Sequence, residues 1–524
     1  MADLLVSAAD TVRLSRPQAT IRRAPTAITA FVGRALKGPV NHPITIGSFN
    51  DYQRVFGGLW QPSTLSYAVE QYFENGGRAA VIVRVCNSGR APTLRLPAGD
   101  GALDLIGVSP GTREFLRASV DYDGINAHET DRFNLILQRI RAPGSEFIED
   151  QEIFRRLSIL PGADRSIMDL LTDSRLMRLN GPLPAQRPDR PRGNSPIAAV
   201  GYVMSNGDGD DGDPLSNYDI IGDAKSGTGL FALQGAESFN FLCVPPLTRE
   251  LDVGLPALLV ALRVCRQRQA MLIVDPPASW SDASDALAGL RSWPLYSEDA
   301  IMFYPRVVTF DRLRGRQETF GSAPAVAGLL ARLDRTCPIW SATDTEEAQM
   351  RPALRPATNV ADTDRDHLLH AGINLLQPTR MPRTKIRLRT LIPEAGVKNE
   401  WRYLSSRRFA LFVMSSIERG TRWVLFEQPG KALWLRVRSE VMAFLQSLED
   451  EGAFAGRSAE ENYFVISDER VNDIEHVAAG RFQLVFGFAD SRPGDFQTFL
   501  VTHEPGNSSV RPASVNRYAL LQQS

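Results

Sequence analysis

Apolar positions along this chain recur with two different periods, which predicts strands that alternate with helices. Residues 26–35 and 79–85 are apolar runs of strand length. Between them, 48–58 and 66–77 carry apolar residues at helical spacing, and both segments end in glycine. The first part of the chain, residues 23–90, therefore predicts a β-α-α-β arrangement.

The pattern changes over residues 91–196. Short apolar runs separated by turn residues predict antiparallel strands, and two short helical patterns follow them. The strands are expected at 118–123, 132–140 and 145–150, and the helices at 151–157 and 165–172. A Pro/Arg-rich run at 182–193 predicts an exposed linker. This segment is therefore expected to be an inserted, mostly-β domain.

From residue 197 to residue 370, apolar strand patterns alternate again with amphipathic helical patterns. The strands are expected at 197–204, 240–246, 270–277 and 301–310, and the helices at 254–268 and 281–291. Such alternation is typical of an α/β sheet with helices on its faces.

The segment 371–504 has the strongest helical patterns and predicts an α+β C-terminal domain. Its helices are expected at 399–420 and 431–452, and its strands at 421–428, 461–469, 480–489 and 495–504. The end segments, 1–22 and 505–524, have no partner nearby in the sequence. We expect them to be terminal arms, and the alternating pattern of the second one suits a strand.

Length and composition fit a chain of several folded domains. It has 524 residues, of which 43% are hydrophobic, enough for about three or four domains. Lys plus Arg number 59 and Asp plus Glu 60, and this balance argues against a chain-wide nucleic-acid surface and weakly favours self-association. Four scattered cysteines favour a reducing compartment over a disulfide scaffold. No signal peptide and no membrane span are expected.

The motif GDGDDG at 207–212 is the first candidate site, because its glycines meet the pattern G-x-G-x-x-G of dinucleotide-binding loops. Turn residues follow it where a helix is needed, and four carboxylates would repel a pyrophosphate: Asp208, Asp210, Asp211 and Asp213. Calcium suits carboxylates better, but Asp211 and Asn217 stand where an EF-hand needs Gly and Glu. These aspartates stay weak metal candidates beside the simpler interpretation of a polar turn.

Signals for catalysis or for a cofactor are weak elsewhere. His367 and His370 share a helical face near Asp364 and Asp366, but zinc needs a third ligand that the sequence does not indicate. The chain has neither the G-x-S-x-G elbow of hydrolases nor the G-x4-G-K-[ST] loop that binds phosphates. We therefore predict no enzyme, no catalytic residue and no cofactor.

Several stretches resemble the tail sheath proteins of contractile phage tails and related injection systems. They are 25–58, 66–85, the acidic loop with its Thr-Gly-Leu segment at 207–233, HAGINLL (370–376), RTL (389–391), EWRYLSSRRFALFVMSSIERGTRWVLFEQ (400–428) and 433–456. The resemblance covers most of the chain and is weakest over 91–200 and 341–365. Departures from the usual residues leave the subfamily open: KIRL before Arg389, FEQP (426–429) and Ser467-Asp468.

The resemblance implies a structural protein. Sheath subunits stack helically around an inner tube and contract to drive it through a target envelope. The domain at 197–370 would be a degraded subtilisin-like α/β domain, the inserted domain would face outward, and the C-terminal domain would face the tube and interlock the subunits. Expected partners are further copies of the chain, with or without sister sheath proteins, the inner tube protein, and baseplate and terminal cap proteins, but neither nucleic acid nor an inserted membrane.

In this family, both terminal arms exchange strands with neighbouring subunits, since the unpaired edge of a sheet can accept a strand. Residues 508–521 would span about 45 Å when fully extended. The arms would use Leu4, Val6, Val12, Leu14, Ile21, Val510, Arg511, Val515, Asn516, Tyr518 and Leu520. Charged residues on the two C-terminal helices are candidates to face the tube, or else are simply solvated: Arg407, Arg408, Arg436, Arg438 and Glu440.

Two other classes stay open at this point. A subtilisin-like hydrolase would need Ser, His and Asp side chains within mutual reach. A calcium-dependent binding module would use the aspartates of 208–213. The resemblance itself implies synthesis in the bacterial cytoplasm and a place in a virion tail or a released extracellular contractile particle, without deciding between phage, bacteriocin and toxin-delivery device.

Overall fold

The computed structural model describes residues 21–192, 201–341, 343–344, 349–351, 354–376, 385–394, 400–490 and 492–513. The chain forms two compact units. Pro25–Arg407 make up the first, which we call the α/β unit, and the residues from Arg408 onward make up the C-terminal unit together with the N-terminal segment that ends at Ala24. The division falls later than residue 371, where the sequence pattern predicts it.

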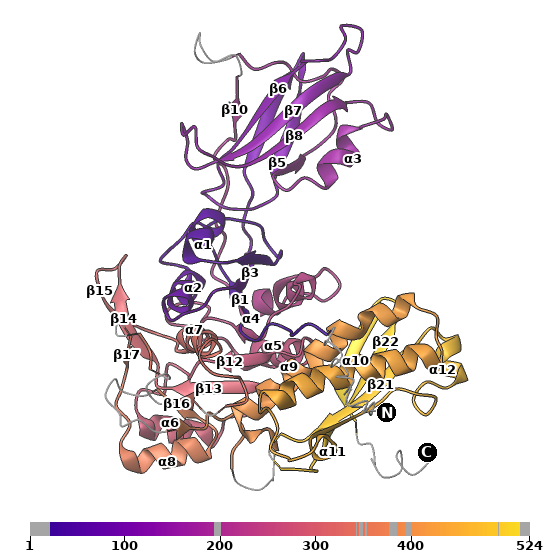
Figure 1. The fold of residues 1–524 in the computed structure, drawn as a ribbon. Coiled ribbons are helices and arrows are strands. Elements are labelled where there is room, and N and C mark those ends of the chain that lie inside the picture. The colour runs from indigo at the N-terminus through magenta and orange to yellow at the C-terminus, as the bar shows by residue number, and fades with distance from the viewer. Residues whose placement is uncertain are drawn as a thin grey trace, which may run out of the picture. The chain divides into compact units, whose positions relative to one another are not determined.

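A seven-stranded sheet forms the centre of the α/β unit (Figure 1), and the predicted segments 23–90 and 197–370 both contribute strands to it. Its order is β18 (Asn374–Leu375), β13 (Ala300–Tyr304), β12 (Met271–Val274), β11 (Phe241–Cys243), β1 (Thr29–Gly33), β3 (Ala80–Arg84) and β2 (Ile44–Ile46). All neighbours pair in parallel except β2, which runs antiparallel to β3. Every residue of β1, β3, β12 and β13 is buried, as expected for a sheet covered on both faces.

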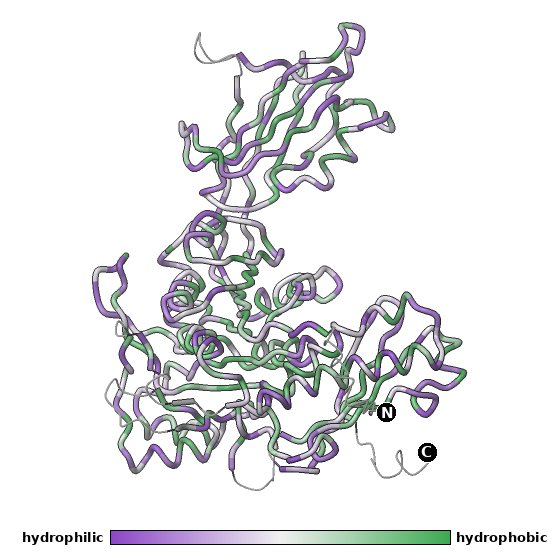
Figure 2. The backbone as a smooth tube through the Cα atoms, viewed as in Figure 1, coloured by the Kyte–Doolittle hydropathy of each residue, from purple (hydrophilic) through white to green (hydrophobic). Residues whose placement is uncertain are grey.

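Helices of the α/β unit cover this sheet, and Figure 2 shows hydrophobic stretches along its strands. They are α1 (Phe49–Phe56), α2 (Thr64–Glu74), α4 (Asn217–Ile221), η1 (Gly229–Gly235), α5 (Leu255–Gln267), α6 (Ala283–Leu290), α7 (Ala323–Leu333) and α8 (Asp362–His370). Ser48 and Ser63 cap α1 and α2 through their side chains. Helices α2 and α7 pack closely because Gly328 has no side chain: a Cβ there would lie 2.3 Å from the Tyr72 carbonyl oxygen.

The inserted domain consists of two sheets around one core. One is β10 (Val203–Met204), β6 (Leu116–Asp121), β7 (Arg132–Ile140) and β8 (Ile148–Ser158), and the other is β4 (Thr93–Ala98), β5 (Gly101–Gly107) and β9 (Met177–Leu179). The single helix described in this domain is α3 (Ile167–Thr172). The mostly-β expectation therefore holds within the described residues.

Two predictions in and after the insertion are wrong, and a third holds only in part. Residues 151–157 form part of β8, not a helix, because they pair with β7 along almost its whole length. The strand expected at 197–204 is described only as β10, which pairs with β6 of the inserted domain and not with the central sheet. The described part of the predicted exposed linker, residues 182–192, is mostly exposed, but it packs on this domain, since Arg187 stacks on Tyr122 and the Tyr122 hydroxyl donates to the Pro188 carbonyl.

Small sheets complete the α/β unit. They join β14 (Val307–Asp311) to β15 (Arg316–Phe320) and β17 (Arg355–Pro356), and β16 (Thr343–Asp344) to β19 (Lys385–Ile386). The single strand expected at 301–310 is divided between β13 and β14, because Pro305 has no N–H to continue the ladder.

The C-terminal unit combines helices with a four-stranded antiparallel sheet of order β20-β21-β22-β23. Its elements, with the turns that lead into it, are η2 (Glu400–Arg402), α9 (Leu404–Thr421), η3 (Arg422–Phe426), α10 (Lys431–Asp450), α11 (Ala459–Asn462), β20 (Tyr463–Ile466), α12 (Ile474–Ala478), β21 (Phe482–Phe488), β22 (Gln497–Glu504) and β23 (Asn507–Pro512). The strand expected at 421–428 is wrong, since η3 continues directly from α9 and leaves Phe426 91% exposed. No described helix is long and apolar enough to cross a membrane.

Candidate assembly surfaces

The outermost strand of the C-terminal sheet is the most accessible strand edge of this unit. β23 pairs with β22 on one side and has no second strand partner among the described residues. Four of its six residues are exposed, and Ser508 and Val510 are half-buried. β20 at the opposite edge is buried along its whole length and packs against α10 and α11. An edge such as β23 presents unpaired backbone groups that can accept another strand.

A buried histidine holds β23 to the rest of its unit. His503 on β22 is fully buried and stacks on Phe482. Its Nδ1 lies 2.8 Å from the Ser508 hydroxyl of β23, and its Nε2 lies 2.8 Å from the Thr421 hydroxyl at the end of α9. Burial, with a contribution from Arg422, lowers the pKa of His503 to about 4. The neutral imidazole therefore connects helix, sheet and terminal strand at physiological pH.

The described start of the N-terminal segment is anchored in the same unit. Ile21 is buried, and a Cβ on Gly420 of α9 would lie 2.7 Å from its Cγ2 atom. The Ala24 amide donates to the Ser416 hydroxyl over 2.9 Å, and Arg23 forms an exposed ion pair with Glu451. Residues 21–24 are therefore held against α9 and Glu451 of the same unit.

The structure places only three of the predicted arm residues. Ile21 packs within its own unit, and Val510 and Arg511 lie on β23, where they pair with Val501 and Leu500 of the same chain. The other arm residues lie outside the described part of the chain: Leu4, Val6, Val12, Leu14, Val515, Asn516, Tyr518 and Leu520. Their exchange with neighbouring subunits stays a prediction.

The two predicted tube-facing helices differ in exposure. α9 is buried along most of its length, and its Arg407 donates two hydrogen bonds to Asp299, over 2.8 and 2.6 Å. Arg407 is only 7% exposed, so its guanidinium serves a buried ion pair and is not offered to a partner. Arg408 next to it is partly buried.

Helix α10 instead exposes a mixed face. Leu435 and Met442 are seven residues apart, lie on the same side of the helix and are both exposed, and Arg438 lies between them. Arg436 stacks on Trp423 and forms ion pairs with Glu427 and Glu440. Sequence reasoning included Arg436, Arg438 and Glu440 among the candidates but missed the two apolar residues between which Arg438 lies.

The aspartates of the GDGDDG loop hold this loop against two segments of the inserted domain, at Thr93 and at Thr112. Asp208 accepts hydrogen bonds from both the backbone amide and the hydroxyl of Thr93, and Asp211 accepts the same pair from Thr112. Asp210 accepts from the Gly212 amide over 2.8 Å. Three of the four candidate carboxylates thus already accept hydrogen bonds within the protein. Asp213 contributes a backbone bridge to Asn87.

Arg84 connects a loop of the inserted domain to the segment that follows β1. Its side chain is 1% exposed and donates to three carbonyl oxygens, those of Ala35, Gly38 and Pro110, over 2.7–3.0 Å. Pro110 belongs to the loop between β5 and β6 of the inserted domain, whereas Ala35 and Gly38 follow β1. A buried guanidinium with its donors satisfied in this way fixes the position of three backbone segments.

No metal site emerges among the described residues, where no three His, Cys, Asp or Glu side chains gather to hold an ion. His367 and His370 lie on the exposed side of α8, and each has its Nδ1 within hydrogen-bond distance of a backbone carbonyl one turn earlier. No third metal ligand joins these two histidines among the described residues.

The carboxyl edge of the central sheet is where a hydrolase of this fold class would keep its reacting groups. Two neighbouring cavities lie there and share Asp275, which directly follows β12, and Pro246. Neither has histidine or cysteine in its lining. Ser322, next to Asp275, donates its hydroxyl proton to the Phe303 carbonyl. These two cavities therefore lack the base that a serine nucleophile requires.

Comparison with known proteins gives matches in structure but not in sequence. No protein-family model matches the chain, and no curated protein matches it. A sheath tail protein from Listeria innocua superposes with a TM-score of 0.56 at 12% identity, over 93% of this chain and 97% of its own.

Two contracted assemblies give similar values. The sheath complex of an extracellular contractile injection system matches with a TM-score of 0.51 at 15% identity, over 95% of this chain and 97% of its own. The helical sheath of the anti-feeding prophage matches with a TM-score of 0.50 at 15% identity, over 94% and 98%. The resemblance seen in the sequence is thus confirmed at the level of structure: this chain has the fold of the sheath proteins of contractile tails and injection systems.

Proposed function

We propose that this chain is a structural sheath subunit of a contractile tail or injection system. It polymerises helically around an inner tube and contracts to drive that tube through a target envelope. The observation that carries the proposal is the likeness to sheath proteins over 93–95% of this chain and 97% of theirs, which spans both units. A fold alone does not fix a function, but the absence of His and Cys from the two cavities at the sheet edge makes the hydrolase alternative weaker.

Terminal strand exchange links the subunits in this proposal. The two arms are anchored in the same unit, one at Ile21 against α9 and the other after β23. Because β23 itself completes the chain's own sheet, the exchanging C-terminal segment begins after residue 513. Val515, Asn516, Tyr518 and Leu520 then pair with another copy, and the arm before residue 21 does the same. The accessible edge of β23 supports a site of strand addition in the acceptor.

The inner tube contacts α10 rather than α9. Arg438 lies between the exposed Leu435 and Met442, which gives one helix face both charge and apolar area. Such a mixed face is common in interfaces, where apolar contacts supply binding energy and charges supply orientation. Arg408 is the remaining candidate on α9.

The remaining parts of the proposal follow from the same fold. Partners are further copies of the chain, with or without sister sheath proteins, the inner tube protein, and baseplate and cap proteins. The subunit is made in the bacterial cytoplasm and becomes part of a virion tail or a released particle. The parallel sheet with helices on its faces supports a relation to subtilisin-like domains, and the GDGDDG loop has a structural role.

The test compares three lengths of the chain by negative-stain microscopy and sedimentation, with and without purified inner tube. The full chain should form tubes or large oligomers, and a chain that ends at Ala513 should stay monomeric with an unchanged unfolding transition. A chain that ends at Gly506 is the matched control, because it also loses β23. It should be less stable, which distinguishes loss of the arm from loss of a strand of the subunit's own sheet. Tubes from the chain ending at Ala513 would contradict C-terminal exchange, and a full chain that stays monomeric even on inner tubes would contradict the sheath role.

A further inference from the structure

A cavity of about 190 Å³ lies at the carboxyl ends of β11 and β12 in the α/β unit. Apolar side chains form most of its wall, among them Val244, Leu258, Val274 and Trp293. Ligands of open α/β sheets bind at this edge. Apolar cavities of about 150 Å³ hold a benzene-sized molecule, so this one has room for a short hydrocarbon chain.

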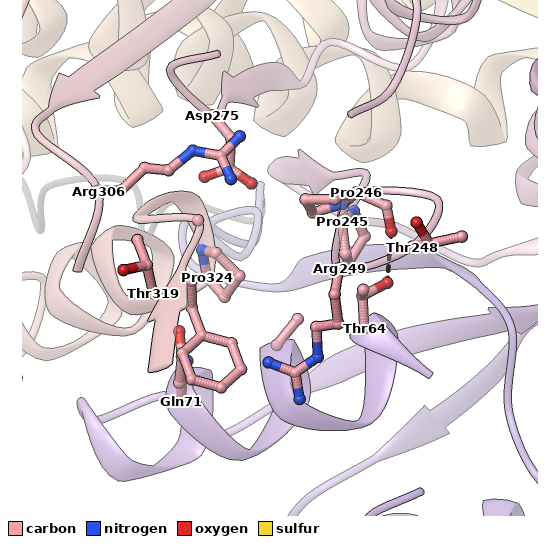
Figure 3. Close-up of a pocket in the computed structure, with 13 residues that line it drawn as sticks. Thr64, Gln71, Pro245, Pro246, Thr248, Arg249, Asp275, Arg306, Thr319 and Pro324 are labelled. Atoms are coloured by element: carbon pink, nitrogen blue, oxygen red, sulfur yellow. Dashed lines mark hydrogen bonds between the residues drawn. The ribbon is translucent and has the colours of Figure 1, made fainter. Parts of the chain in front are cut away.

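Two carboxyl groups, Asp252 and Asp275, interrupt the apolar lining. Asp252 is paired with Arg306, whose Nε also donates to the Pro276 carbonyl over 2.8 Å. Figure 3 shows the Arg306 guanidinium beside Asp275. One guanidinium thus faces two carboxyl groups, which leaves the site one negative charge in excess when Asp275 is ionised.

Asp275 is held in place by the start of α7. Its Oδ1 accepts from the Ala323 amide over 2.7 Å, and a Cβ on Gly321 would lie 2.2 Å from its Oδ2. Burial raises the pKa of Asp275 to about 6. At neutral pH the carboxylate is therefore ionised in surroundings that disfavour its charge, a situation that a bound cation relieves.

Trp293 belongs to the apolar wall of the cavity. Its indole ring packs edge-on against Trp280, with 5.5 Å between the ring centroids. The wall therefore includes an aromatic surface that a hydrocarbon chain can contact.

We propose that this cavity binds an alkylammonium ion whose charged head lies at Asp275 and whose hydrocarbon chain contacts the apolar wall. A small alkylamine has this chemistry, and so does a lysine side chain contributed by a second copy of the chain. The site goes beyond the sheath function and does not depend on it.

The neighbouring, smaller cavity does not offer an alternative anion site. Its volume is about 30 Å³, which holds a single water. Two basic side chains line it, Arg249 and Arg306, and Arg306 is paired with Asp252. Arg249 is paired with Asp311 over 3.0 Å and lies against the rings of Tyr67 and Phe320. Figure 3 shows this guanidinium pointing away from Asp275.

Calorimetric titration of the full chain with 4-aminobutan-1-ol and with butane-1,4-diol, its neutral counterpart, tests the proposal at pH 7.5. The amine should bind at least tenfold more tightly than the diol. Binding should weaken about tenfold between pH 7.5 and pH 5, as expected for a carboxyl with a pKa near 6. Asp275→Asn should lose at least tenfold, whereas Asp366→Asn, which neutralises an exposed carboxylate of α8, should leave binding unchanged.

Equal binding of amine and diol, no binding of either, or full binding by Asp275→Asn would overturn the proposal. If Asp275→Asn fails to fold, Leu258→Phe gives the same test, because it fills the cavity without changing its charge; undiminished binding by this variant would also overturn it. The source of the ammonium group follows from repeating the titration on assembled particles. Unchanged affinity there identifies a free amine as the ligand, and lost affinity identifies a lysine of a second copy.

Discussion

The central sheet of the α/β unit and the four-stranded sheet of the C-terminal unit are held together in different ways. Every residue of β1 in the middle of the first sheet is buried. β23, the last strand of the second, exposes most of its residues and depends on its backbone pairing with β22 and on the contact of Ser508 with His503. The first is a permanent core, whereas the second ends in a strand that can be extended or displaced at small cost.

Under the proposed function, this difference suits a subunit that stays folded while its connections move. A sheath that contracts has to rotate its subunits without unfolding them. Strand pairing that relies on backbone hydrogen bonds survives such rigid-body motion if the segments that lead to it act as hinges. Predictions that separate the two sheets therefore test the account.

The largest expected effect is in the α/β core. Phe31→Ala removes a fully buried ring of β1 that packs edge-on against Tyr72, with 5.4 Å between ring centroids. Cavities of this kind cost roughly 3–5 kcal/mol. Urea unfolding should show this loss in the transition of the α/β unit. A loss below about 1 kcal/mol would mean that the core is far looser than the burial indicates.

The two units should respond to acid in opposite directions. The pKa of His503 is about 4 in the folded protein, below its ordinary value, so folding excludes a proton and the C-terminal unit loses stability as pH falls from about 6.5 to 4. The pKa of Asp275 is raised to about 6, so the folded α/β unit retains a proton and its contribution increases as pH falls from about 6 to 4. Each effect is roughly 3 kcal/mol at most.

Hydrogen exchange, corrected for the intrinsic pH dependence, measures both units in one sample. Protection of β22 and β23 should fall between pH 6.5 and pH 4.5, and His503→Gln should remove this dependence. Asp275→Asn should remove the opposite contribution in β12 and α7. If protection of the two units in the unmodified protein changed in the same direction as pH falls, the predicted opposite effects of His503 and Asp275 would be contradicted.

A smaller effect is expected at the surface of α10. Arg438→Glu reverses an exposed charge between Leu435 and Met442 and should weaken assembly on inner tubes roughly tenfold, as expected for a charge at the edge of an interface. The matched control is Arg95→Glu on the inserted domain, where the side chain is 69% exposed. Pelleting of tubes with bound sheath measures both. Equal losses would mean that net charge, not the α10 face, governs assembly.

The smallest effect is expected at β23. Val510→Ala shortens a half-buried side chain opposite Val501 and should lower the free energy of unfolding by less than about 1 kcal/mol. Arg511→Pro removes a backbone donor of the ladder, because the pair of Arg511 and Leu500 lies two residues from the pair in which Ala513 donates to Thr498, and should detach the strand. If Val510→Ala were as damaging as Phe31→Ala, the comparison between the two sheets would fail.

Sequence patterns predicted the elements of the α/β core because buried strands and capped helices have strong local signals. Helix α1 and the strands β3 and β12 lie within the segments that periodicity predicted, and α2 begins two residues before its predicted start at residue 66. η3 was misread as a strand, because its β-branched and aromatic residues favour strands while its position, directly after α9, decides otherwise.

The candidate sites were less predictable, because they depend on residues far apart in the chain. Asp208 and Asp211 find their partners, Thr93 and Thr112, about a hundred residues earlier, which no local motif reveals. Arg407 forms a basic pair in the sequence but turns inward to Asp299. The cavity beside Asp275 combines segments from β11 to the chain after α6, and only the folded sheet brings them together.

The most direct measurement is cross-linking between copies of the chain that differ in isotope. Tyr518 is replaced by p-benzoylphenylalanine, and light- and heavy-nitrogen chains are mixed before assembly and irradiation. The account predicts cross-links to the C-terminal unit that join light and heavy chains in the proportion of random mixing. Cross-links that join only chains of the same isotope would show that the C-terminal arm folds back on its own subunit, and would contradict strand exchange.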